Sequence, residues 1–130
     1  MKNLVETVDP NDIEWSQSKS APAGCWGKSI FRYDQGRLGD VGRAGGYTVQ
    51  YKFEPNSFYR PLRVIGQPVE IFVLSGTLNI NEQEISTGQW TRALPTDEPL
   101  VFGSVAGAEI IAIVRGEVEL ADKVDLGEKK

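Results

Sequence analysis

The chain is 130 residues long, 40% hydrophobic and 25% charged, carries a formal net charge of -4, and contains no histidine and one cysteine. Its length and composition predict one soluble globular domain with a single core, and they exclude a two-domain enzyme. The acidic balance provides no basic surface for a phosphate backbone, so no nucleic-acid partner is expected, and the lack of histidine excludes triads and metal sites that need an imidazole.

Residues 1–24 mix proline, asparagine and glycine without a sustained period and are expected to form an irregular arm. Short β-branched and aromatic runs follow, separated by turn-forming residues, at 26–33, 47–53, 69–74, 77–80, 90–94, 100–102 and 108–114. They predict an all-β sandwich or barrel over residues 25–120, followed by a charged tail at 121–130.

The segment between the first two runs is rich in glycine. Residues 35–46 hold five of the chain's 14 glycines, without the strand–glycine–helix pattern of a phosphate-binding loop. We therefore expect a flexible connector there. In the next run, Tyr47, Val49, Tyr51 and Phe53 alternate with polar residues, which is typical of a strand with one face in the core.

Four segments, in this order, carry a family resemblance: Trp15 with Gly24 and Lys28-Ser29-Ile30; the run 47–53 ending in Glu54-Pro55-Asn56; the segment 69–76 ending in Val73-Leu74-Ser75-Gly76; and the segment from Gly88 to Pro95. In order and spacing they resemble the cupins, and within them the ChrR-type branch of small single-domain proteins. The resemblance implies a double-stranded β-helix, or jelly-roll barrel, behind the irregular arm.

The resemblance also implies where a metal would be held. Cupins place a histidine pair, a glutamate and a further histidine inside the barrel. The corresponding positions here are Arg63 and Ile65, or Leu62 and Val64, for the pair, Val69 for the glutamate, and Pro99 or Leu100 for the last histidine. These residues do not replace the lost ligands, so we expect the fold without a metal or other cofactor.

Three residues are candidates for catalysis. Arg63 adjoins a lost ligand position, where its guanidinium would hold a carboxylate or enolate, the alternative being a loop arginine in solvent. Glu70 follows the lost glutamate position by one residue, which favours a surface ion pair over an inward general acid or base unless a bulge intervenes. Tyr51 would donate a proton where histidine is missing.

Four residues are candidates for substrate binding. Tyr47 shares the apolar face of its strand with Tyr51, and Trp26 and Trp90 would wall the pocket, although core packing is the plainer role for each. Arg92 has the same parity as Trp90, whose indole we expect to be buried, and it would otherwise form a rim salt bridge with an acidic neighbour. Cys25 has no activating histidine and is expected to be inert.

These features favour a metal-independent enzyme that isomerises, cyclises or eliminates from a small, partly apolar molecule, an isomerase, cyclase or lyase. The alternatives are a non-catalytic binding or sensory barrel and a dimerisation module. Apolar residues on both faces of 71–74 and 110–114 predict a homodimer. No export signal and no apolar run of about 20 residues is present, so a cytoplasmic location without membrane contact is expected.

Overall fold

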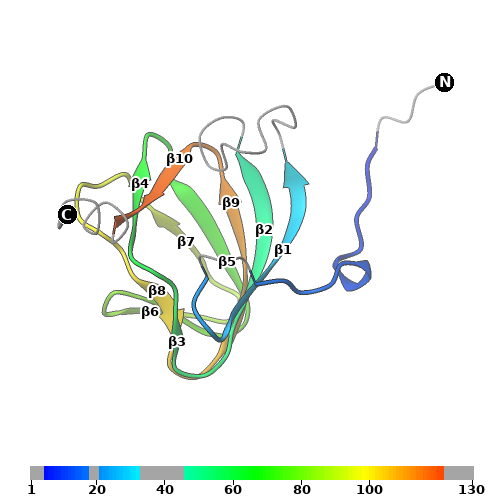
Figure 1. Ribbon diagram of the computed structural model, residues 1–130, viewed down its shortest axis with the longest axis horizontal. Helices are drawn as coiled ribbons and strands as arrows, with labels where there is room; N and C mark the ends of the chain where they lie inside the picture. The colour runs from blue at the N-terminus through cyan, green and yellow to red at the C-terminus, as the bar shows by residue number, and fades with distance from the viewer. Residues whose placement is uncertain (1–4, 18–20, 33–45, 122–130) are drawn as a thin grey trace.

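The structure, a computed structural model, describes residues 5–17, 21–32 and 46–121. Within these ranges it is built from β1 (Cys25–Arg32), β2 (Tyr47–Phe53), β3 (Ser57–Phe58), β4 (Leu62–Ile65), β5 (Val69–Ile80), β6 (Gln83–Ser86), β7 (Trp90–Ala93), β8 (Phe102–Ser104), β9 (Ala108–Val114) and β10 (Glu117–Leu120), with one 3₁₀ turn at Pro10–Asp12 (Figure 1). The prediction of an all-β fold is confirmed. Residues 33–45, which hold most of the glycine-rich connector, and 122–130 of the expected tail lie outside the described ranges.

Strand β5 connects the two halves of the barrel. Its first half pairs with β7 and β9, and its second half pairs with β6 and β8. The resulting sheet follows the order β1-β2-β9-β5-β8-β3, and β4 and β10 form a separate pair. All these pairings are antiparallel, and the strands curl around a common interior (Figure 1).

A bend separates the two halves of β5. The register with β9 shifts between Val73 and Ser75, and Gly76 has a φ of 77°. A Cβ atom at Gly76 would collide with the carbonyl oxygen of Gly107, so only glycine suits both the left-handed backbone and the close approach. The glycine bend expected between 69–74 and 77–80 therefore lies within one continuous strand.

Alternate residues of β2, β5 and β9 fill the interior. On β5, Val69, Ile71 and Val73 are buried, and the intervening residues face outward. On β9 the same alternation buries Ala108, Ile110, Ala112 and Val114. Burial of branched aliphatic side chains stabilises a fold by about 1.5–3 kcal/mol each, so this face is the main source of stability.

The N-terminal arm is anchored to the outside of β1 and β2. The Lys28 ammonium donates a hydrogen bond to the carbonyl oxygen of Pro10 at 2.8 Å. Lys28 and Lys52 also lie over the ring of Trp15, at 4.5 and 4.8 Å from its centroid. The hydrogen bond to Pro10 and the cation–π contact with Trp15 stabilise the charge of Lys28, a residue that is only 8% exposed. No helix among the described residues has the length and apolar character needed to cross a membrane.

An aromatic pair lies on the outer face of β5 and β7. Phe72 is directly opposite Trp90, with ring centroids 4.8 Å apart. The expectation that Trp90 is buried is wrong, because its side chain is 62% exposed. Phe72 lies between buried Ile71 and Val73, so its cross-strand partner projects from the side opposite the core.

We propose that this outer face binds a second copy of the chain, because exposed aromatic surfaces mark interfaces and tryptophan is enriched at their energetic centres. Light scattering at micromolar concentration should give twice the chain mass of 14.3 kDa. Trp90→Glu should return the mass to that of one chain. Val105→Glu, in the β8–β9 loop and 57% exposed, should leave the dimer intact. A wild-type mass of one chain would contradict the proposal.

Candidate functional site

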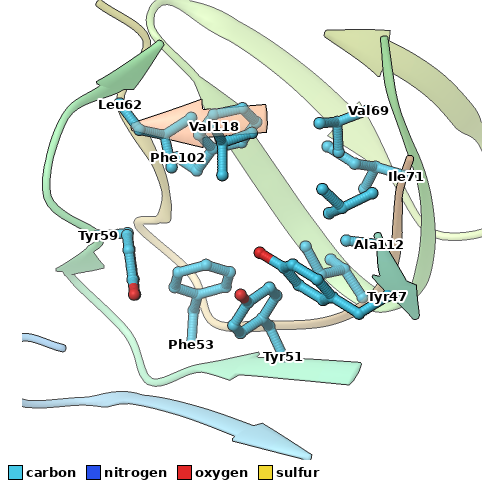
Figure 2. Close-up of a pocket in the computed structure, with 12 residues that line it drawn as sticks. Tyr47, Tyr51, Phe53, Tyr59, Leu62, Val69, Ile71, Phe102, Ala112 and Val118 are labelled. Atoms are coloured by element: carbon cyan, nitrogen blue, oxygen red, sulfur yellow. The ribbon is translucent and has the colours of Figure 1, made fainter. Parts of the chain in front are cut away.

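The barrel encloses an inner cavity of about 60 Å³. Its lining comes from six strands and the β3–β4 connection, and it is almost entirely hydrocarbon (Figure 2). The hydroxyls of three tyrosines are the exception: Tyr47, Tyr51 and Tyr59. The cavity is several times larger than the space that one water molecule needs, and its lining suits a compact organic molecule.

The tyrosines form one wall of the inner cavity. Tyr47 and Tyr51 both project inward from β2, and Tyr59 faces them from the β3–β4 connection (Figure 2). The rings of Tyr51 and Tyr59 are tilted by 53° with centroids 6.1 Å apart. The backbone N–H of Tyr59 donates to the carbonyl oxygen of Phe102 at 2.7 Å, which fixes the irregular segment that carries it.

Burial controls the ionisation of this wall. It raises the pKa of Tyr51 well above the ordinary 10.0, and the neighbouring Tyr47 and Tyr59 raise that pKa further. Burial also raises the pKa of Tyr47, with a contribution from Tyr59, while Arg32 and a hydrogen bond with Tyr51 act in the opposite direction. Both phenols are therefore neutral at pH 7 and act as hydrogen-bond donors.

The Tyr47 and Tyr51 hydroxyls share one hydrogen bond. It raises the pKa of Tyr51 and lowers that of Tyr47. The expectation that Tyr47 and Tyr51 face the interior agrees with this geometry.

The structure corrects the expected position of Arg63. Leu62 lines the cavity and Val64 is 1% exposed, so the residue between them on β4 points outward. The Arg63 guanidinium forms a salt bridge of 3.0 Å with Glu119 of β10, and its Nε donates to the carbonyl oxygen of Asp97 at 3.0 Å. The cation expected inside the barrel is therefore part of an outer-face ion pair.

Glu70 and Arg92 also lie outside the inner cavity. Glu70 falls between the buried Val69 and Ile71 and forms a salt bridge of 2.8 Å with Arg115. Glu70 therefore points outward and forms a surface ion pair, as its position one residue after the lost glutamate position predicted. Arg92 is opposite Glu70 in the strand register, on the same outer face. The expected inward positions of Arg92 and Trp90 are wrong, because the parity that they share belongs to this outer face.

Trp26 contributes to a second depression beside the inner cavity. We call this the outer hollow; its volume is about 360 Å³. The Trp26 indole N–H donates to Glu54 at 3.1 Å, which leaves the ring on the wall of the outer hollow. Cys25 is 2% exposed, and burial raises the pKa of its thiol, consistent with an unreactive side chain.

Tyr59 is a site residue that sequence reasoning missed. It lies in an irregular segment between β3 and β4, so no alternation assigns it to a face. β3 and β4 belong to different sheets, and the segment that connects them brings the Tyr59 ring to the cavity.

The donor set does not fit the metal of a cupin. Leu62 and Val69, at two of the implied ligand positions, present hydrocarbon to the cavity, and Arg63 points away from it. Across the described ranges, no group of three or more acidic, cysteine or histidine side chains is placed to hold a metal ion. Neutral phenols do not replace imidazole and carboxylate ligands.

No protein-family model matches the chain, and no curated protein sequence matches it. Solved structures are similar in fold. A putative acetylacetone dioxygenase from Methylibium petroleiphilum is 12% identical with a TM-score of 0.74, covering 93% of this chain and 83% of its own. An RmlC-like cupin from Ralstonia eutropha is 16% identical with a TM-score of 0.69, covering 88% and 71%. A polyketide cyclase from Streptomyces resistomycificus is 18% identical with a TM-score of 0.65, covering 91% and 86%. The chain therefore has the cupin fold.

The raised pKa of Tyr51 predicts a loss of stability at high pH. Tyr51 ionises near pH 10.0 in the unfolded chain and at a higher pH in the folded protein. The stabilisation that the neutral phenol gives to the folded state is therefore complete below pH 10, and it is lost as the pH rises through the pKa of the folded state. The thermal midpoint should fall above pH 10 in the wild type and fall less in Tyr51→Phe. Phe102→Leu, which alters the same cavity without an ionisable group, should follow the wild-type slope. Parallel slopes for Tyr51→Phe and wild type would contradict the prediction.

Proposed function

We propose that this protein binds a compact, largely apolar organic molecule inside the barrel without a metal, and that the tyrosine wall holds an oxygen atom of that molecule. One observation carries the proposal: among the described residues that line the cavity, the tyrosine hydroxyls are the only polar side-chain groups on an otherwise hydrocarbon surface. Ligand sites of this type combine an apolar body with a few polar groups that fix orientation.

We assign the ligand-binding role to Tyr47, whose side chain lines the inner cavity. Burial raises its pKa, so its neutral hydroxyl is a hydrogen-bond donor at pH 7. A buried donor without an acceptor is costly, so an oxygen-bearing ligand is favoured over a pure hydrocarbon of the same shape. The hydrocarbon groups opposite the tyrosines would contact the rest of the ligand, and their burial supplies most of the affinity.

The lining favours binding over acid–base catalysis. Isomerase, cyclase and lyase reactions of small carbonyl compounds need a base as well as an acid. Among the described residues that line the inner cavity, none carries a carboxylate or an amine. The phenols whose pKa values are raised above 10 supply little phenolate at pH 7. The non-catalytic alternative therefore agrees better with this site, while the phenols would polarise a bound carbonyl.

Binding inside the barrel predicts a specific pattern of variants. Cyclohexanone and benzyl alcohol, used as compact probes in ligand-observed NMR, should bind the wild type. Ala112→Ile fills the cavity and should abolish binding, whereas Ile113→Leu, on the outward face of the same strand, should not. Tyr47→Phe should weaken binding by up to about tenfold, the loss expected for one neutral hydrogen bond. Unchanged binding to Ala112→Ile would place the probes elsewhere and overturn the proposal.

The donor set predicts that the purified protein binds no stoichiometric transition metal. Elemental analysis of untagged protein should give well under one equivalent of iron, manganese, nickel or zinc, before and after dialysis against each metal. Probe binding should be unaffected by a chelator. One equivalent of metal, removed by a chelator together with probe binding, would contradict metal-independent binding.

A further inference from the structure

The inner cavity and the outer hollow meet at the same three tyrosines. Tyr47, Tyr51 and Tyr59 line both depressions. On the side of the outer hollow, Gly27 is opposite Tyr51 in the strand register, and a Cβ atom there would lie only 3.4 Å from the ring. The missing side chain keeps the tyrosine wall accessible from the outer hollow.

A β-bulge brings a positive charge to this wall. Ser29 pairs with Val49, but the register then shifts, so that Arg32 rather than Phe31 is opposite Tyr47. Without the extra residue, strand alternation would turn Arg32 to the other face of the sheet. Arg32 and Tyr47 both line the outer hollow, and the positive charge of Arg32 lowers the pKa of Tyr47.

Among the described residues that line the two depressions, the charge is positive. Arg32 is exposed at the outer hollow, and no acidic residue is among the described residues that line it. The salt bridges formed within the described ranges, Arg63 with Glu119 and Arg115 with Glu70, do not involve it. Hydrocarbon on one side of the tyrosines and an arginine on the other complement a molecule with an apolar body and an anionic end.

We propose that the ligand is a compact carboxylic acid, with its apolar body in the inner cavity and its carboxylate at the tyrosine wall, where it accepts hydrogen bonds from Tyr47 and Arg32. This inference rests on the proposed function and adds the charge of the ligand. A guanidinium binds a carboxylate through parallel N–H donors, and charge-assisted hydrogen bonds are stronger than neutral ones. The phenol and the guanidinium together would satisfy both carboxylate oxygens.

Benzoate and benzamide provide a matched test because they share one ring and differ in charge. Isothermal titration of the full chain should give tighter binding of benzoate, and added salt should weaken benzoate only. Arg32→Gln should weaken benzoate about tenfold and leave benzamide unchanged, because it removes one charge-assisted contact. Arg92→Gln removes an arginine that lies on the outer face of β7 and lines neither depression, so it should affect neither probe.

The outcomes separate this inference from the proposed function. Equal affinities of the two probes, unchanged in Arg32→Gln, would overturn the carboxylate assignment and leave binding inside the barrel intact. Binding of cyclohexanone or benzyl alcohol without binding of benzoate would do the same. If none of the four probes binds, both proposals are wrong. Arg32→Lys, which keeps the charge and loses the planar fork, should retain part of the benzoate affinity, and circular dichroism should show that each variant is folded.

Discussion

The pairing of β5 with four other strands is the constraint on which the rest of this fold depends. β5 contacts β7 and β9 before its bend and β6 and β8 after it, and β2, β1 and β3 are positioned through those partners. The bend requires Gly76, because the backbone of Gly107 passes where a side chain would lie. A single glycine thus closes the sheet on itself and creates an interior with space for a ligand.

Strand alternation then decides which chemistry the interior contains. Every second residue of β2, β4 and β9, and of β5 as far as Val73, points inward, and most of these are aliphatic. Acidic and basic residues at the intervening positions face outward, where Glu70 pairs with Arg115 and Arg63 with Glu119. The tyrosines of β2 are inward residues with a polar end, which is why the described lining of the inner cavity has hydrogen-bond donors but no fixed charge. The bulge in β1 is the exception that brings Arg32 to the rim.

The sequence predicted the class of fold and part of the site. Alternation in 47–53 correctly assigned Tyr47 and Tyr51 to the interior. Alternation alone failed for Trp90, because it shows which residues share a face of the strand but not which face is buried. The large indole suggested that the face of Trp90 is buried, whereas Trp90 is 62% exposed. Arg63 was misplaced because the ligand positions of a family were mapped by spacing across a loop. Arg32 was missed because a bulge is a matter of pairing, and a sequence read strand by strand does not reveal it.

The order of the strands along the chain also determines when each one finds its partner during synthesis. β5, β6 and β7 follow one another closely, so their pairings close soon after they leave the ribosome. β2 must wait for β9, since Phe53 pairs with Ala108 and Tyr47 with Val114. Until β9 emerges, Tyr47 and Tyr51 lie on a strand that is unpaired along one edge. Nascent chains of this topology fold slowly and expose apolar edges, a condition under which chaperones act.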